Sequence, residues 1–283
     1  RLQAAAKPYC QRGVLCATLN SGTLDYPAGR WQTERSAAHP MYCEEVEIQT
    51  GRIPAAVWGV PTGRCIVAAH GSMSHKKDVP IVLLAQAAQA HGWQVLSFDL
   101  PQHGARAQNG RPCTMRNCAA DLETVMQYAR LQWPHLALFG CSMGAYAGLL
   151  ACRKEALEAA FFLSPVLDMA HMVEDMMAQF HIPQEVLRSQ KKLLLPNGQA
   201  LYWSDLCYLR ENPVCMWATP TYILRGSEDF LCRPQALQAF AQRFPCRIQT
   251  AAGAEHYFHT PGQLGQFSAW LHESLGALPP AAP

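Results

Sequence analysis

Residues 138–146 read LFGCSMGAY, and this stretch decides how the rest of the chain is interpreted. It places Ser142 between Gly140 and Gly144 in a G-x-S-x-G pattern, directly after the apolar run HLALF. A strand that turns sharply into a helix has this pattern when the turn presents a reactive serine. An ordinary turn that needs small residues has the same letters. The remaining sequence therefore has to distinguish a nucleophile from a simple turn.

Short apolar runs alternate with amphipathic segments on both sides of this stretch. The runs predict strands at 42–50, 54–60, 64–70, 93–99, 135–140, 157–165, 219–226 and 246–253. The amphipathic segments predict helices at 78–92, 118–132, 143–154, 234–244 and 262–276. This alternation predicts an α/β fold with a mostly parallel central sheet flanked by helices. A short link joins the first two strands, so we expect that edge to be antiparallel.

The alternation stops after Pro165 and resumes near residue 218. The segment between is rich in Met, Leu and Gln, and its stretches LDMAHMVEDMMAQFH and PQEVLRSQKKLLL predict two or three short helices. The predicted organisation is an N-terminal extension (1–41), an α/β core (42–165 and 218–278), a helical lid (166–217) and a tail (279–283).

The composition is that of a globular protein with a sizeable core. Of the 283 residues, 49% are apolar and 16% are charged, which excludes a disordered chain. The net charge is +2 and the basic residues are scattered, so no nucleic-acid partner is expected. No run of apolar residues is long enough to predict a membrane span. The oligomeric state is left open.

The 12 cysteines do not form a recognisable framework. Several lie in apolar segments, where a small buried thiol is the usual reading, and no C-x-x-C pair occurs. We therefore expect no metal site, no redox motif and a reducing, cytoplasmic location. The sequence begins at Arg1, so a signal peptide that has been removed stays open.

Three further sites follow predicted strands, as Ser142 does. His70-Gly71-Ser72 ends one strand, Asp229 lies just past another, and His256 lies just past the last. In an open parallel sheet, ligands bind beyond the carboxyl ends of the strands. We therefore expect these residues to meet at one edge of the sheet.

These residue types fit nucleophilic catalysis. A serine hydroxyl needs a base to take its proton, and imidazole suits that task near neutral pH. A carboxylate then fixes the tautomer of the imidazole and stabilises its charge. Ser142, Asp229 and His256 supply the three groups, and the backbone N–H groups of Ser72 and Met143 are candidates for an oxyanion hole.

The acid and the base each have competitors. Glu228 is adjacent to Asp229, but the G-x-x-D spacing from Gly226 favours Asp229. Asp168 is a further candidate acid, although a helix cap is the more ordinary role for it.

The G-x-x-H spacing from Gly253 favours His256 as the base and leaves His259 as a surface or supporting residue. His70 is expected to orient its loop, and Asp99 and His103 to hold theirs together. His75 and Lys76 are expected in a solvated loop, with a position near the mouth of the pocket as the alternative.

With these residues in place, the sequence resembles the α/β-hydrolase fold superfamily. The resemblance rests on HGS (70–72), FDLPQHG (98–104), GCSMG (140–144), GSED (226–229) and GAEH (253–256), and it covers about residues 45–278. It is strongest to the serine esterase and lipase branch, which holds cinnamoyl and feruloyl esterases, monoacylglycerol-lipase-like enzymes and serine peptidase relatives. Two residues depart from the common pattern: Gln102, where many relatives have Gly, and Cys141, where His is common.

The resemblance implies a hydrolase that acts on an ester or related acyl bond without a cofactor, with a short helical lid after the sixth strand. A small-molecule carboxylic ester is the expected substrate. Met169, Met172, Met176 and Trp203 in the lid are candidate substrate contacts, although packing of the lid on the sheet explains them equally well.

Three alternatives to an esterase stay open. A peptidase would need a fixed charge, which Glu174 or Asp175 in the lid would supply. A thioesterase or amidase would use the same three residues. A binding protein that has lost catalysis usually lacks one of the three, and here all are present.

Overall fold

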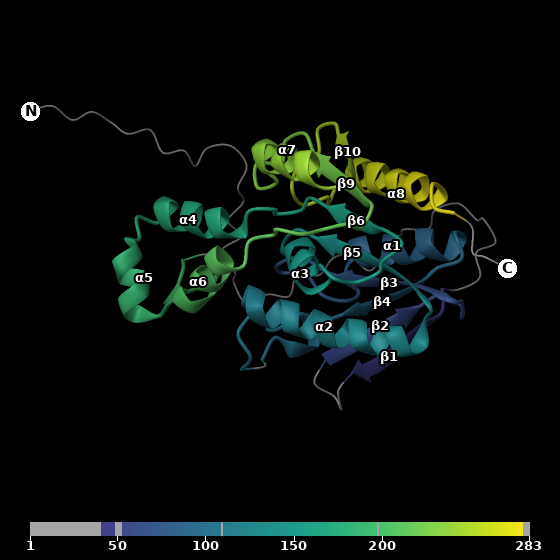
Figure 1. Cartoon of the computed structure of the whole chain (residues 1–283), viewed down its shortest axis with the longest axis horizontal. Helices are drawn as coiled ribbons and strands as arrows, with labels where there is room; N and C mark the ends of the chain where they lie inside the picture. The colour runs from purple at the N-terminus through teal and green to yellow at the C-terminus, as the bar shows by residue number, and fades with distance from the viewer. Residues whose placement is uncertain (1–40, 49–52, 109, 197, 280–283) are drawn as a thin grey trace, which may run out of the picture.

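The structure is a computed structural model that describes residues 41–48, 53–108, 110–196 and 198–279. The predicted N-terminal extension and tail lie outside these residues, apart from Met41 and Pro279. Within the described part of the chain, eight strands form one sheet in the order β1-β2-β4-β3-β5-β6-β9-β10 (Figure 1). They are β1 (Cys43–Ile48), β2 (Ile53–Trp58), β3 (Arg64–Ala69), β4 (Gln94–Phe98), β5 (His135–Cys141), β6 (Ala160–Leu163), β9 (Thr221–Gly226) and β10 (Cys246–Ala251).

Strand pairing confirms the mostly parallel sheet and its antiparallel edge. β2 pairs antiparallel with both β1 and β4, whereas the neighbouring pairs from β4 through to β10 are parallel. In the centre, Ala69 of β3 lies opposite Phe98 of β4 and Gly140 of β5. The carboxyl ends of these strands therefore lie at one edge of the sheet.

Helices cover both faces of the sheet (Figure 1). One face carries α1 (Val79–Ala90) and α8 (Pro261–Gly276), which pack on each other. The opposite face carries α2 (Met115–Gln132) and α3 (Met143–Ala151), and the buried side of α7 (Pro234–Arg243) joins the same core. Because both faces are covered, β3 and β6 are buried along their whole length, which explains why their sequences are apolar apart from Arg64 at the start of β3.

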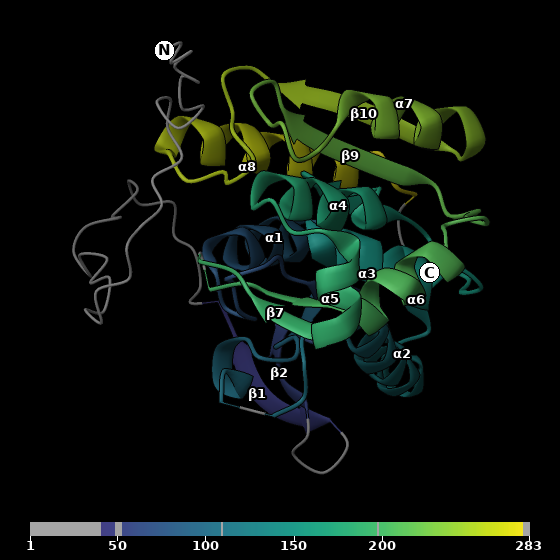
Figure 2. The same ribbon diagram turned by 90° about the vertical axis from the view of Figure 1, so that its left-hand side faces the viewer.

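The predicted helical segment after the sixth strand contains α4 (Met169–Gln179), α5 (Gln184–Gln190) and α6 (Trp203–Glu211). β6 ends at Leu163, so this segment leaves the sheet at the carboxyl ends of its strands. Figure 2 looks onto that end, with α4, α5 and α6 in front of α3.

The prediction of a helix through residues 183–195 is wrong in its second half. α5 ends at Gln190, Lys191 adopts a positive φ of 65°, and the chain continues as β7 (Lys192–Leu194), paired antiparallel with β8 (Ala200–Tyr202). The apolar run LLL fits a strand as well as a helix, and its pairing with β8 settles the choice.

Candidate active site

Ser142 lies on the sharp turn between β5 and α3. Its backbone adopts φ 52° and ψ −118°, a strained conformation for a residue with a side chain. A Cβ at Gly140 would lie 2.4 Å from the Cα of Ala145, and one at Gly144 would lie 2.4 Å from the carbonyl oxygen of His70. The turn therefore leaves no room for a Cβ at either glycine.

We expect Gly144→Ala to destabilise the fold by about 2–3 kcal/mol, since backbone rather than a flexible side chain blocks the new methyl group. Urea unfolding measures this loss. Gly265→Ala in α8 is the matched control: its Cβ meets nothing within 4 Å, so the variant should gain about 0.5–1 kcal/mol. Equal stability of the two variants would contradict the steric account of the turn.

Three predicted residues meet at this turn in one hydrogen-bonded chain. His256 Nε2 lies 2.9 Å from Ser142 Oγ, and His256 Nδ1 lies 2.9 Å and 3.0 Å from the two carboxylate oxygens of Asp229. Asp229 and His256 are buried, whereas Ser142 is partly exposed. The serine hydroxyl is therefore within reach of solvent while its two partners are shielded.

The surroundings of Asp229 keep its carboxylate charged. Burial by itself raises its pKa, but the hydrogen bond and charge of His256 and the N–H of Cys232 outweigh burial and lower the pKa below its ordinary value. Oδ1 accepts hydrogen bonds from the N–H groups of Leu231 (3.0 Å) and Cys232 (2.9 Å), which fix the plane of the carboxylate.

Ser164, directly after β6, is a supporting residue that the sequence analysis missed. It is fully buried with a positive φ of 46°. Its hydroxyl makes no hydrogen bond of ordinary geometry to any described residue. It nevertheless lies close enough to the Asp229 carboxylate to help lower the pKa of that group. A serine at the end of a strand carries no special signal in one sequence, so only the structure shows this contact.

The loops that carry the acid and the base are tied to each other. The N–H of Glu228 donates to the carbonyl oxygen of Ala254 (2.9 Å). After His256, a capping box at the start of α8 joins Thr260 and Gln263, and Gln263 also accepts from the N–H of His259 (3.1 Å). These bonds hold the imidazole against Ser142.

The alternative acid and base lie elsewhere. Glu228 and His259 are exposed at the surface. Asp168 caps α4 by accepting from the N–H of His171 (3.2 Å), which confirms the helix-cap role predicted for it. Of these competitors, none enters the hydrogen-bonded chain of Ser142 within the residues that the structure describes.

The loop after β3 lies against the serine turn. A Cβ on Gly71 would be 3.3 Å from the Cβ of Ser142, so Gly71, the residue before Ser72, lies against the turn that carries the hydroxyl. Met143 is the first residue of α3, and its N–H lies at the positive end of the helix dipole. Among the described residues, no acceptor bonds the backbone N–H of Ser72 or Met143.

His70 fixes this loop, as predicted. Burial lowers the pKa of its imidazole to about 4, so the ring is neutral near pH 7. Nδ1 lies 2.7 Å from the carbonyl oxygen of Gly71, and Nε2 accepts from the N–H of Leu100 (3.1 Å). The ring therefore links the loop after β3 to the loop after β4.

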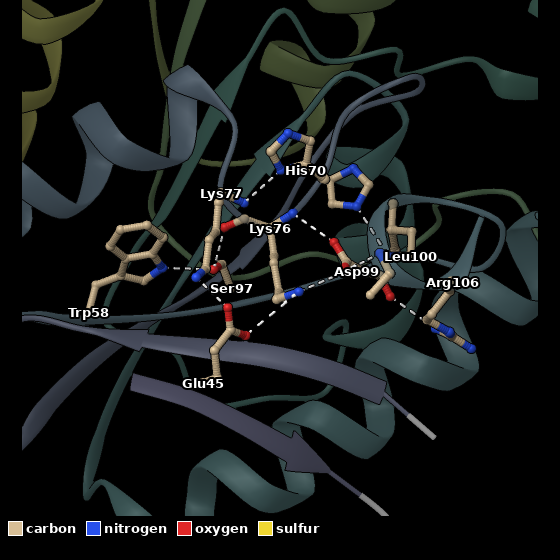
Figure 3. Close-up of polar contacts among 11 residues, drawn as sticks. Glu45, Trp58, His70, Lys76, Lys77, Ser97, Asp99, Leu100 and Arg106 are labelled. Atoms are coloured by element: carbon tan, nitrogen blue, oxygen red, sulfur yellow. Dashed lines mark hydrogen bonds and ion pairs between the residues drawn. The ribbon is translucent and has the colours of Figure 1, made fainter. Parts of the chain in front are cut away.

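A buried ion pair fixes the other end of the same loop (Figure 3). The prediction of a solvated loop holds for His75 and Lys77, which are exposed, but is wrong for Lys76, which is buried. Lys76 Nζ lies 2.9 Å from the fully buried carboxylate of Asp99, which also accepts from the backbone N–H of Lys76 (2.8 Å). Ser97 Oγ donates to the carbonyl oxygen of Lys76 and accepts from Trp58 Nε1. Asp99 Oδ2 also accepts from the N–H of Ala105 (3.0 Å), which confirms the expected role of Asp99 in holding its own loop.

We expect Lys76→Met to cost about 3 kcal/mol of stability near neutral pH, because it leaves a buried carboxylate unpaired. Burial raises the pKa of Asp99, and its bonds to Lys76 outweigh this and lower it. The wild type therefore loses stability as the pH falls through the lowered pKa, while the variant relieves its unpaired charge by protonation. Urea unfolding measures the free energy of unfolding of the wild type and of Lys76→Met. We expect the difference between the two proteins to be smaller at about pH 4 than at about pH 7.

Lys77→Met is the matched control for this prediction. Lys77 pairs only at the surface, with Glu45, so its replacement should change stability by less than about 1 kcal/mol. A loss in Lys76→Met no larger than that of Lys77→Met would contradict the account.

The candidate substrate residues of the segment 166–217 differ in exposure. Met169 is buried in the core cluster, so packing explains it. Met172, Met176 and Trp203 are partly buried against the same cluster. The structure thus supports a packing role for all four and leaves three of them accessible in part.

Three large, exposed apolar side chains that directly follow site residues in the chain escaped the sequence analysis. Met73, Phe230 and Tyr257 are 72%, 70% and 53% exposed. Each directly follows a predicted site residue in the chain, and the ring of Tyr257 packs edge-on against His256, with centroids 5.2 Å apart. The spacing of single apolar residues in loops carries no periodic signal, so the sequence did not reveal this apolar rim of Met73, Phe230 and Tyr257.

A cavity of about 370 Å³ lies between α3, α6 and α7, lined by residues that include Tyr146, Asp168 and Phe240 but not Ser142. It is therefore separate from the serine hydroxyl. Among the described residues, no group of three or more His, Cys, Asp or Glu is placed to hold a metal ion. Nor does that part of the chain contain a helix with the length and apolar character needed to cross a bilayer.

The sheet order, the helices on both faces and the serine on a strained turn after β5 define an α/β-hydrolase fold. A family model described as serine aminopeptidase, S33, matches residues 61–203, just over half of the 283 residues. The chain therefore belongs to the S33 serine aminopeptidase family of the α/β-hydrolase superfamily. A search of the curated proteins found no match.

Solved structures show the same fold at low sequence identity. A protein from Agrobacterium vitis S4 described as a hydrolase is 15% identical, with a TM-score of 0.69, covering 84% of this chain and 99% of its own. Alpha/beta hydrolase domain-containing protein 10 from mouse is 14% identical (TM-score 0.66, 83% and 98%). Est1E from Butyrivibrio proteoclasticus is 19% identical (TM-score 0.63, 82% and 97%).

Proposed function

We propose that this protein is a serine hydrolase that cleaves a carboxylic ester through an acyl-enzyme, with Ser142 as nucleophile, His256 as base and Asp229 as orienting acid. The observation that carries the proposal is the continuous chain from Ser142 Oγ through His256 to Asp229, with both contacts at 2.9 Å. Ser142 and His256 are 114 residues apart in the chain, and Asp229 and His256 are 27 apart, yet the three side chains meet within hydrogen-bond distance.

Acylation begins when Ser142 Oγ attacks the ester carbonyl and its proton passes to His256 Nε2. The imidazolium that forms is stabilised by Asp229, whose carboxylate is charged and shielded from water. The carbonyl oxygen becomes an oxyanion, which the N–H groups of Ser72 and Met143 stabilise; one such donor is worth about 10²–10³ in rate. His256 then protonates the leaving alcohol.

Deacylation repeats the steps with water as the nucleophile. His256 takes a proton from water, the hydroxide attacks the acyl carbonyl, and the same N–H groups hold the second oxyanion. Ser142 recovers its proton from His256 and the acid leaves. Every step uses groups of this chain, and water is the only further reactant.

An ester fits the surroundings better than a peptide terminus. The carboxylate of Glu174, one candidate to grip an amine, already accepts two hydrogen bonds from Arg210. Asp175 lies between His171 (3.3 Å) and Arg233 (3.9 Å). The apolar rim instead favours an uncharged acyl or aryl group.

We further propose that the segment 166–217 acts as a lid over the serine. It leaves the sheet at the carboxyl ends of the strands, the end that carries Ser142, and it faces the viewer in Figure 2. Met172, Met176 and Trp203 are partly buried on it and are the residues that we assign to the substrate side.

The test is hydrolysis of nitrophenyl esters of increasing acyl length together with methyl ferulate and an aminoacyl-nitroanilide. Methyl ferulate is included because Est1E has been solved with ferulic acid bound. We expect turnover of the esters and little turnover of the nitroanilide. Faster turnover of the nitroanilide than of every ester would replace the esterase proposal by a peptidase.

A further inference from the structure

Two cysteines lie in contact at the start of α2, apart from the serine, histidine and aspartate. The Sγ atoms of Cys113 and Cys118 are 3.7 Å apart. Cys113 directly precedes the N-cap residue Thr114, and Cys118 is the fourth residue of the helix. Side chains at these two positions commonly pack together at the start of a helix, so simple packing is the first explanation to exclude.

Two observations go beyond packing. Cys118 is fully buried whereas Cys113 is partly exposed, so Cys113 is the more accessible residue of the pair. The side chain of His103 lies close enough to Cys113 to lower the pKa of its thiol. Among the cysteines that the structure describes, no other two are recorded with their sulfurs in contact.

The neighbours of Cys113 favour its thiolate. The hydrogen bond from Cys118 lowers the pKa of Cys113, burial opposes this, and His103 lowers it further, to about 6. The hydrogen bond with Cys113 and burial raise the pKa of Cys118 instead. A thiolate is the reactive form of cysteine, so Cys113, the more accessible of the two, is the nucleophile of the pair.

We propose that Cys113 and Cys118 form a reversible thiol–disulfide site that reacts with low-molecular-weight disulfides. The Cys113 thiolate attacks one sulfur of the disulfide RSSR, forms a mixed disulfide and releases RS⁻. Cys118 loses its proton to solvent and attacks the Cys113 sulfur, which releases the second RS⁻. The protein has then lost two thiol protons and two electrons, and RSSR has become two RSH.

The geometry allows the second step. The sulfurs must approach from 3.7 Å to about 2.0 Å. Cys113 lies outside the helix, because α2 begins at Met115, so its side chain is not held by the helical ladder. The C-x-x-C spacing that usually marks a redox pair is absent, since the two cysteines are five residues apart, and the sequence analysis therefore predicted no redox motif.

The pair is linked to the proposed oxyanion loop. His103 Nε2 accepts from the N–H of Met73 (3.1 Å), and Met73 directly follows Ser72. Because His103 lies close to Cys113, movement of the Cys113 sulfur toward Cys118 changes the surroundings of the His103 ring. This consequence rests on the proposed function: we expect the disulfide to lower kcat for ester hydrolysis more than it changes KM, and reductant to restore kcat.

Tryptic digestion reads the disulfide directly. The reduced protein is incubated with oxidised glutathione, alkylated and digested. Trypsin cleaves after Arg116, between the two cysteines, and not between Arg111 and Pro112. The disulfide therefore joins peptides 107–116 and 117–130, and we expect this linked pair, which dithiothreitol separates.

Single variants separate the two roles. In Cys118→Ala, Cys113 should stay as a mixed disulfide with glutathione, because no second thiol resolves it. In Cys113→Ala, Cys118 should remain a free thiol. Circular dichroism confirms that each variant is folded. A mixed disulfide on Cys118 in place of Cys113 would overturn the assigned order of attack.

Cys215 is the internal control, because it is exposed and has no cysteine partner among the described residues. The proposal is overturned if Cys215 carries glutathione while Cys113 and Cys118 are both still alkylated. This readout does not use hydrolysis, so its failure is distinct from failure of the proposed function. If the disulfide-linked peptides form but kcat for ester hydrolysis is unchanged, the thiol–disulfide site is retained and its proposed link to the oxyanion loop is overturned.

Discussion

Replacing Ser142 by alanine is expected to lower kcat for ester hydrolysis by about 10⁴–10⁶. In the proposed mechanism the hydroxyl forms the acyl-enzyme, and in the variant His256 Nε2 loses its partner at 2.9 Å. Alanine removes one atom from a turn that is already strained at this residue, so the fold should be retained. Initial rates with a nitrophenyl ester measure the loss, and thermal unfolding checks the fold.

Ser189→Ala is the control for this variant. Ser189 is exposed, and its hydroxyl donates only to a carbonyl of its own helix, Val186. Its rate should stay within about twofold of wild type, as for most surface substitutions. Esterase activity in Ser142→Ala equal to that of Ser189→Ala would remove Ser142 as the nucleophile.

Asp229→Asn is expected to lower kcat by about 10⁴. The amide carries no charge to stabilise the imidazolium of His256. Leu231 and Cys232 hold one oxygen through their N–H groups, so the amide nitrogen takes the other position, 3.0 Å from His256 Nδ1. A donor at that position favours the tautomer whose Nε2 carries a proton and faces Ser142 without accepting from it.

The adjacent carboxylate provides a matched control. Glu228→Gln makes the same chemical change at an exposed side chain one residue away, and it should leave kcat within about twofold of wild type. Steady-state kinetics of the two variants decide between the two acids. A larger loss in Glu228→Gln than in Asp229→Asn would reverse the assignment.

The order of strands and helices and the meeting of Ser142, Asp229 and His256 could be predicted from the sequence. Apolar periodicity identifies strands, and parallel strands bring their carboxyl ends to one edge. Residues that follow strands therefore converge whatever their separation in the chain.

The contacts of single side chains could not be predicted in the same way. Lys76 is buried because Asp99, 23 residues later, lies opposite it, and the hydroxyl of Ser164 matters only because Asp229 lies beside it. The periodicity of apolar residues along the sequence does not indicate which distant polar side chains pair. The β7–β8 hairpin was missed for a related reason. A strand of three residues, such as β7, is too short to show the alternation of side chains that distinguishes a strand from a helix.

Covalent labelling with a fluorophosphonate probe tests the central claim most directly, because it needs no knowledge of the substrate. Labelled protein is digested with trypsin, and peptide 131–153, which contains Ser142, is examined by mass spectrometry. We predict an adduct on Ser142 that forms in the wild type, is absent in Ser142→Ala and forms far more slowly in Asp229→Asn. Folded wild-type protein that stays unlabelled, or that carries the adduct on another residue, would contradict the assignment of Ser142 as an activated nucleophile.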